Sequence, residues 1–275
     1  MREMIEKSKL LIFDLDGTLY EDTDHFDYYC RLLQQRADIS IQGEFYNSYE
    51  EMKQGKHPVA IGKVYDLKEN ASLTVDPLTL QVTAAHLWDG TQMNEETMKR
   101  EYSGELTYDF ERFIAIGDGW WLPYVTAMHY GLSQQDTWDC YNATKVYMVS
   151  DEFSLTKTPL LKESLEKLKK KKHLVLMTNS DKEDALRLLL ELELQDVFDE
   201  IFPSSQKPVK TKEILMAITS KYKVKPDEAV SIGDNFINEI APALLMGLNA
   251  VYIQPNGYDL QHDNLYIVPT LGQAF

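Results

Sequence analysis

Short apolar segments alternate with amphipathic ones through the second half of the chain, and this alternation constrains the fold more than any other feature. The apolar segments have the length of strands, and they cover residues 10–13, 173–178, 197–202, 229–232 and 249–253. Helical periodicity marks the stretches that alternate with them, at residues 160–171, 181–192, 210–222 and 239–246. Such an order favours parallel strands joined by right-handed crossovers. We therefore expect an α/β fold with a Rossmann-like, doubly wound parallel sheet.

The interval from about residue 20 to 158 interrupts this alternation and is rich in Tyr and Trp. Helical periodicity marks residues 25–36 and 133–148, and the second of these stretches opens with a Ser-x-x-Asp pattern typical of a capping box. The secondary structure of residues 59–87 is ambiguous from the sequence. Residues 117–121 contain two glycines and two tryptophans, which form either a platform for a flat ligand or a turn that leads into a core.

This interruption divides the chain into two predicted domains. Residues 1–20 and 157–275 together form the sheet-containing core. Residues 21–156 form a mostly α-helical domain that is inserted into it.

The composition, with 44% hydrophobic and 26% charged residues, is that of a folded protein. A formal net charge of -16 repels a phosphate backbone, so nucleic-acid polymers are not expected as partners. The two cysteines lie far apart and lack the spacing of a zinc site, which fits a reducing compartment. There is neither a signal-peptide core nor an apolar stretch of about 18 residues, so we expect a cytoplasmic protein with no membrane partner. The sequence leaves the oligomeric state open.

Two aspartates directly follow the apolar segment 10–13, and Gly17 then turns the chain. Alternate residues of an extended segment point the same way, so Asp14 and Asp16 can reach one ligand. Two carboxylates this close repel each other unless a cation neutralises them or one of them binds a proton. Because ligands of parallel sheets bind beyond the carboxyl ends of the strands, we expect a site here.

Four motifs in the chain resemble, in order, those of the haloacid dehalogenase-like hydrolase superfamily. The first is Asp14–Thr18, the second is Leu174–Ser180 with a strand that ends in Thr, and the third is Lys207-Pro208. The fourth is Ser231–Asp234, where an apolar strand ends in an acid, with Glu239 beyond it. The chain departs from the family pattern at Glu239, where many members have aspartate. The resemblance spans the predicted core and implies the phosphatase branch, with the insertion as a substrate-selecting cap between motifs one and two.

The resemblance implies phosphoryl transfer to Asp14, which acts as the nucleophile. Asp16 would be the general acid that protonates the leaving alkoxide and then the base that takes a proton from water. Thr178 and Lys207 complete the expected catalytic residues, and together with Asn179 they would bind the substrate phosphate. Lys207 would also hold Asp14 in place.

An anionic nucleophile that approaches an anionic phosphate needs a neutralising cation, and Mg²⁺ takes oxygen ligands. The resemblance implies Mg²⁺ as the cofactor, bound by the carboxylates of Asp14 and Asp234 and by the backbone carbonyl of Asp16. Glu239 carries the same charge as the family's aspartate on a longer arm. It would therefore bind a metal-bound water or pair with Lys207.

The dehalogenase branch of the family does not use a second aspartate at the position of Asp16, so this residue favours phosphate esters. The leading hypothesis is a Mg²⁺-dependent phosphatase that hydrolyses a small phosphomonoester, a nucleoside monophosphate or a sugar phosphate, through an aspartyl-phosphate. Leu19-Tyr20 after the first motif also resembles nucleotidase-type members. Two alternatives stay open: a phosphosugar mutase with the same nucleophile, and a catalytically silent binding or scaffold protein of the same fold.

Overall fold

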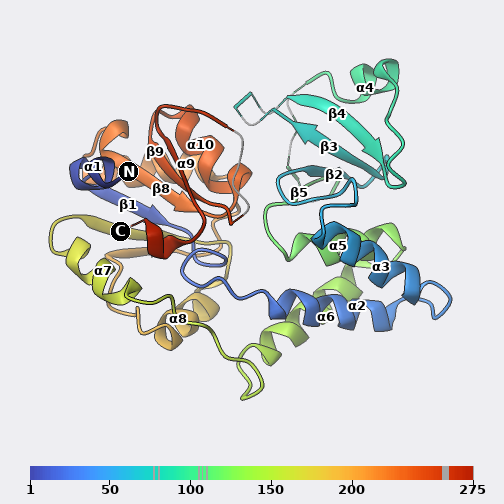
Figure 1. The fold of residues 1–275 in the computed structure, drawn as a ribbon, viewed down its shortest axis with the longest axis horizontal. Helices are drawn as coiled ribbons and strands as arrows, with labels where there is room; N and C mark the ends of the chain where they lie inside the picture. Colours follow the sequence, from blue (N-terminus) through green and yellow to red (C-terminus); the bar gives the residue numbers. More distant parts are fainter. Residues whose placement is uncertain are drawn as a thin grey trace. The chain divides into compact units, whose positions relative to one another are not determined.

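The computed structural model describes residues 1–76, 78–79, 81–104, 106, 108–109, 111–255 and 260–274. The chain divides into two compact units, which can be followed by colour along the sequence in Figure 1. The core unit comprises residues 1–22 and 155–275, and the insertion unit comprises residues 23–154. Within the described ranges, no helix is both long and apolar enough to cross a membrane.

The core unit contains a sheet in which the described strands have the order β10-β9-β8-β1-β6-β7. The strands are β1 (Leu10–Phe13), β6 (His173–Met177), β7 (Glu200–Phe202), β8 (Ala229–Gly233), β9 (Asn249–Ile253) and β10 (Leu265–Val268). Each of these strands is parallel to its neighbours. The expected α/β fold with a doubly wound parallel sheet is confirmed.

Helices cover this sheet. They are α1 (Arg2–Lys7), α7 (Leu161–Lys169), α8 (Lys182–Glu191), α9 (Thr211–Tyr222) and α10 (Ala241–Leu245). Figure 1 shows α9 and α10 on one side of the sheet and α7 and α8 on the other. Leu10 and Ile12 of β1 belong to one core cluster with Leu215 and Ile218 of α9, while the alternate residues of β1 point to the other face. Burial on both faces explains why β1 is apolar at every position.

Two parts of the core unit differ from the sequence-based expectation. The helix expected at residues 239–246 is a π-helical turn, η2 (Phe236–Ile240), followed by the short helix α10. Pro242 lies at the start of α10, where the missing N–H has no intrahelical partner to lose. The edge strand β10 was not predicted, because no helical periodicity separates it from β9 and the argument depended on that alternation.

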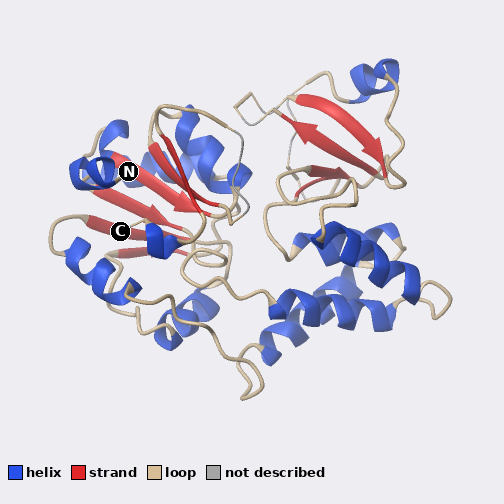
Figure 2. Cartoon of the chain, viewed as in Figure 1, coloured by secondary structure: helices blue, strands red, loops and turns tan. Residues whose placement is uncertain are grey.

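The insertion unit contains helices and a separate sheet, both visible in Figure 2. The helices are α2 (Asp24–Arg36), α3 (Gln42–Lys53), α4 (Glu95–Glu101), α5 (Trp121–His129) and α6 (Gln134–Tyr147). The sheet is antiparallel, with the order β4-β3-β2-β5 for the described strands β2 (Val64–Asp66), β3 (Ala71–Val75), β4 (Val82–Leu87) and β5 (Phe113–Ala115). Most of its regular structure is helical, as expected, but the sheet was not predicted.

The prediction for residues 59–87 was ambiguous because the strands there are only three to six residues long, which is too short for a period of two to be recognised. The helical part of the unit was easier to predict. In α6 the capping box is present: Ser133 accepts the backbone N–H of Asp136, and the Asp136 side chain accepts that of Ser133.

The Gly-Trp-Trp segment at residues 119–121 leads into the core of the insertion unit. The Trp120 ring lies against Phe26, Tyr29 and Tyr141, with ring centroids 5.4, 5.5 and 5.0 Å apart. A Cβ atom on Gly119 would lie 2.2 Å from Cδ2 of Phe26, so only glycine fits there. Of the two interpretations of this segment, the turn into core tryptophans is therefore the one that describes Trp120.

The chain leaves the core unit after Asp22 and returns to it at Leu155. The carboxylate of Asp22 accepts hydrogen bonds from the backbone N–H of Thr156 at 2.8 Å and from its hydroxyl at 2.6 Å. The last residues before the insertion and the first residues after it are thus hydrogen-bonded to each other.

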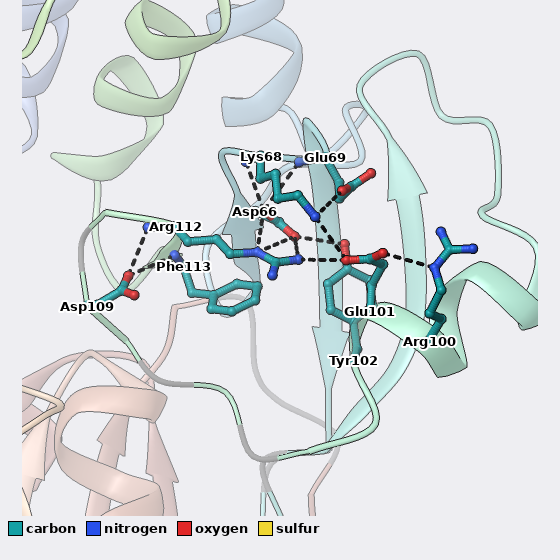
Figure 3. Close-up of polar contacts among 9 residues, drawn as sticks. All are labelled: Asp66, Lys68, Glu69, Arg100, Glu101, Tyr102, Asp109, Arg112 and Phe113. Atoms are coloured by element: carbon teal, nitrogen blue, oxygen red, sulfur yellow. Dashed lines mark hydrogen bonds and ion pairs between the residues drawn. The ribbon is translucent and has the colours of Figure 1, made fainter.

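A buried ion pair ties the small sheet of the insertion unit together (Figure 3). Asp66, at the end of β2, is fully buried, and its Oδ2 atom lies 2.9 Å from Nη2 of Arg112. It also accepts hydrogen bonds from the Tyr102 hydroxyl at 3.0 Å and the Lys68 backbone N–H at 2.9 Å. Arg112 continues the network to Glu101 of α4 at 3.3 Å. A buried carboxylate needs such partners, so the network links β2, α4 and the residue before β5.

We predict that Asp66→Asn lowers the free energy of unfolding by about 2–4 kcal/mol, because the partly buried Arg112 then loses its fully buried carboxylate partner and keeps only Glu101. Urea denaturation of wild type and variant measures this difference. The control is Glu69→Gln, which breaks the more exposed pair between Glu69 and Lys68 and should cost less than about 1 kcal/mol. Equal losses in the two variants would contradict the prediction.

Two histidines of the insertion unit lie in places that disfavour their charged form. Nδ1 of His57 accepts a hydrogen bond from the Val59 backbone N–H at 3.1 Å, so a proton on that nitrogen would break the bond. His129 stacks on Trp88 with ring centroids 3.7 Å apart. Burial lowers the pKa of each histidine from 6.5 to about 4.

The histidine pKa is 6.5 in the unfolded chain and about 4 in the folded protein, so between pH 6.5 and 4 the unfolded chain binds protons on both histidines that the folded chain does not bind. We therefore predict that the free energy of unfolding falls as the pH drops from 6.5 towards 4. A double variant, His57→Asn with His129→Phe, should lose less stability than wild type over this range in urea denaturation. An unchanged pH dependence in the double variant would show that other groups are responsible.

Candidate active site

The strand register of the core unit brings three motif ends side by side. β1 lies between β8 and β6, with Phe13 opposite Ile232 on one side and Leu176 on the other. Asp14 continues the ladder, because its backbone N–H donates to the Ile232 carbonyl at 2.9 Å. Asp234 follows β8 and Thr178 follows β6, so both lie at the carboxyl edge beside Asp14. This edge of the sheet is the candidate site.

Lys207 connects two acids at this edge. Its Nζ atom lies 2.6 Å from Oδ1 of Asp14 and 2.6 Å from Oε1 of Glu239. The three side chains are almost fully buried, so water screens these charges poorly. Lys207 follows β7, on the far side of β6 from β1, and the segment between them returns to the end of β6, where the Ser205 backbone N–H donates to the Thr178 carbonyl at 3.0 Å. Of the two roles expected for Glu239, the structure contains the pair with Lys207.

Asp14, Asp234 and Glu239 form an acidic cluster. One carboxylate oxygen from each lies within 4.8 Å of the others. The cluster has three carboxylates, two of which contact the single ammonium of Lys207, so acidic groups outnumber basic ones among these four side chains. Carboxylate oxygens are the ligands of hard divalent cations, and this donor set fits Mg²⁺.

The pKa values of the two acids that contact Lys207 are raised chiefly by burial. Burial raises the pKa of Asp14, and it raises that of Glu239 to about 8, while Lys207 acts in the opposite direction on both. Asp16 raises the pKa of Asp14 further. Burial alone would lower the pKa of Lys207, but the two carboxylates outweigh it and the pKa rises. A divalent cation in the cluster would favour the ionised carboxylates.

Glycine is required where the first motif approaches the fourth. Gly17 has φ of +74°, which side chains rarely adopt, and a Cβ atom there would lie 2.1 Å from Oδ2 of Asp234. Gly233 is also restricted, because its Cβ would lie 2.8 Å from Oε2 of Glu239. The Asn235 backbone N–H donates to that same Oε2 atom at 3.0 Å, which fixes the Glu239 carboxylate from within the π-helical turn.

The carboxylate of Asp16, the second aspartate, has different hydrogen-bond partners from that of Asp14. Its Oδ1 atom accepts a hydrogen bond from the Tyr20 hydroxyl at 2.5 Å, and its Oδ2 atom accepts one from the Ser180 hydroxyl at 2.9 Å. Asp16 is only partly buried, in contrast to Asp14. The two aspartates of the first motif thus lie in different environments.

The second motif contributes both Thr178 and Asn179. Thr178 is fully buried, and its hydroxyl oxygen accepts the Ser180 backbone N–H at 3.0 Å. Asn179 binds the backbone of Lys207 twice: its Nδ2 donates to the carbonyl at 3.1 Å, and its Oδ1 accepts the N–H at 2.7 Å. In the structure the Asn179 side chain therefore orients the residue that carries the ammonium.

The structure thus joins Asp14, Glu239 and Lys207 by direct contacts, places Asp234 in the same cluster, and sets Asp16 and Thr178 on adjacent strand ends. Sequence reasoning did not identify Tyr20 and Ser180 as partners of Asp16. Tyr20 lies two residues after the first motif and Ser180 ends the second, but nothing in a single sequence indicates that their hydroxyls meet one carboxylate.

The chain is similar to several known proteins. Three solved structures align with most of the chain: a haloacid dehalogenase-like family hydrolase from Xanthomonas campestris, a 2-haloacid dehalogenase from Pseudomonas syringae and a predicted phosphoglycolate phosphatase from Haemophilus somnus. The first has 15% identity, coverage of 96% of this chain and 92% of that chain, and a TM-score of 0.48. The second has 16% identity, coverage of 97% of this chain and 96% of that chain, and a TM-score of 0.46. The third has 15% identity, coverage of 90% of this chain and 85% of that chain, and a TM-score of 0.42.

These likenesses do not select between dehalogenase and phosphatase chemistry. The comparison with curated proteins gave no significant match. The family comparison is more informative, because the model of the haloacid dehalogenase-like hydrolases matches residues 8–247, from just before β1 to just after α10. The chain therefore belongs to the haloacid dehalogenase-like hydrolase family.

Proposed function

We propose that the protein is a Mg²⁺-dependent phosphatase that hydrolyses a small phosphomonoester through an aspartyl-phosphate on Asp14. The observation that carries this proposal is the placement of Asp14, which is buried, bound to Lys207 at 2.6 Å and part of the acidic cluster. Asp16, two residues away, supplies the second carboxylate that phosphate-ester chemistry needs. The substrate class that we propose is a nucleoside monophosphate or a sugar phosphate.

In the first step an oxygen of the Asp14 carboxylate attacks phosphorus, and the bond between phosphorus and the ester oxygen breaks. The departing alkoxide takes a proton from the Asp16 carboxyl group, so an alcohol leaves. Lys207 holds Asp14 at the end of β1 and provides positive charge near the transferring group. The Thr178 hydroxyl and the residues around Asn179, at the end of β6, bind phosphate oxygens.

In the second step water attacks the phosphorus of the aspartyl-phosphate, and the bond between phosphorus and the Asp14 oxygen breaks. Asp16, now ionised, takes the proton from that water. Inorganic phosphate leaves, and both carboxyl groups return to their starting protonation states. Release of orthophosphate distinguishes this reaction from that of a mutase, which would return the phosphoryl group to a sugar.

Mg²⁺ would be held by the carboxylates of Asp14 and Asp234 and by the backbone carbonyl of Asp16, with Glu239 acting through a bound water or through Lys207. Its contribution is positive charge that offsets the repulsion between the nucleophile and the phosphate. The insertion, residues 21–156 in our division of the chain, is proposed to act as the cap that selects the substrate.

We predict that wild-type protein releases orthophosphate from at least one member of a panel of small phosphomonoesters, and that EDTA abolishes the release. Asp14→Asn should lower turnover by at least about 1,000-fold, because the amide is a poor nucleophile. Asp196→Asn, which changes an exposed acid of the core unit, is the matched control and should leave turnover unchanged. Turnover that survives in Asp14→Asn would refute the assigned nucleophile.

The close approach of Gly17 to Asp234 gives a second prediction. Gly17→Ala should weaken Mg²⁺ binding by at least about tenfold in calorimetric titration, because the new Cβ displaces Asp234. Gly247→Ala is the control: its φ of +78° is equally unfavourable for alanine, but its Cβ would be 3.8 Å from the nearest atom. It should lose stability and keep its Mg²⁺ affinity. Similar Mg²⁺ affinities in both variants would contradict the metal site.

A further inference from the structure

The carboxylate of Asp16 is held at both of its oxygens by hydroxyl groups from two different parts of the core unit. Tyr20 comes from the segment that follows β1, and its hydroxyl lies 2.5 Å from Oδ1. Ser180 comes from the segment that follows β6, and its hydroxyl lies 2.9 Å from Oδ2. A carboxylate bound at one oxygen can rotate about its Cβ–Cγ bond, whereas one bound at both oxygens is fixed in its plane.

The two hydroxyl donors are themselves immobilised. Tyr20 is fully buried, and its backbone forms a bridge with that of Asp16. Ser180 is also buried, and its backbone N–H is bound by the Thr178 hydroxyl oxygen at 3.0 Å. A partly exposed carboxylate is therefore oriented by a well-buried shell, which is the arrangement found around groups that must act in one geometry.

We propose that Tyr20 and Ser180 are positioning residues that orient the Asp16 carboxyl group for proton transfer to the leaving group. This inference rests on the proposed phosphatase function and adds residues that act through Asp16 without contacting the reacting atoms. A purely structural role predicts that losing either hydroxyl changes stability alone. A positioning role predicts a defect that depends on how much the leaving group needs a proton.

That dependence is measurable with two substrates. An alkyl phosphate expels a strongly basic alkoxide and needs the acid, whereas p-nitrophenyl phosphate expels a weakly basic phenolate and hardly needs it. The ratio kcat/KM covers the reaction only up to formation of the aspartyl-phosphate, so the later role of Asp16 with water does not affect it. The comparison of kcat/KM on the two substrates therefore isolates proton donation.

The experiment measures kcat/KM of wild type, Tyr20→Phe and Ser180→Ala on glycerol phosphate and p-nitrophenyl phosphate, with Asp16→Asn as the reference for a missing acid. We expect each hydroxyl variant to lose at least about tenfold on glycerol phosphate and less than about threefold on p-nitrophenyl phosphate. The matched control is Tyr222→Phe, which removes a hydroxyl that donates to Glu200 at 3.4 Å, at the opposite edge of the sheet. It should match wild type on both substrates.

Equal losses on the two substrates, or no loss on either, would overturn the positioning role while leaving the phosphatase intact. If the buried Tyr20→Phe variant does not fold, Ser180→Ala gives the same comparison through a smaller change. Absence of phosphate release from wild type on both substrates and on the wider panel of phosphomonoesters would instead refute the proposed function itself.

Discussion

The candidate site depends on one buried ammonium group. Lys207 lies between Asp14 and Glu239 at 2.6 Å from each, and none of the three could keep its charge in a dry interior without the others. The contact also has a structural consequence, because it ties the segment after β7 to the end of β1 and to the π-helical turn after β8. Three motifs that are far apart in the sequence are thereby fixed at one edge of the sheet. The acidic cluster exists as a unit because this lysine offsets part of its charge.

Much of this arrangement could be predicted from the sequence, because its signals are local. β1, β6, β8 and β9 are fully apolar or nearly so, and the helices between them keep their periodicity. The order of a parallel sheet then places the strand ends on one edge, and the resemblance to the family motifs is what adds Thr178 and Asp234 to Asp14 there.

The features that were missed are those that depend on tertiary contacts. The antiparallel sheet of the insertion has short strands, and the buried pair between Asp66 and Arg112 that links β2 to the residue before β5 is separated by 46 residues, so it leaves no local pattern. The π-helical turn that holds Glu239 follows from contacts at the site and has the same composition as an ordinary helix start. The hydroxyls of Tyr20 and Ser180 were not recognised for the same reason, since their shared partner is visible only in three dimensions.

The hydrogen bonds between Asp22 and Thr156 have a consequence for how such a chain diversifies. The insertion unit has more than one hundred residues, but the chain leaves and re-enters the core unit at residues that are hydrogen-bonded to each other. For the core unit, the insertion is therefore equivalent to a loop with closely spaced ends. Replacement of the whole insertion unit by another would then leave the strand order and the acidic cluster of the core unit unchanged. The acidic edge and the inserted unit could then vary independently of each other, because Asp22 and Thr156 close the break in the core unit by hydrogen bonds.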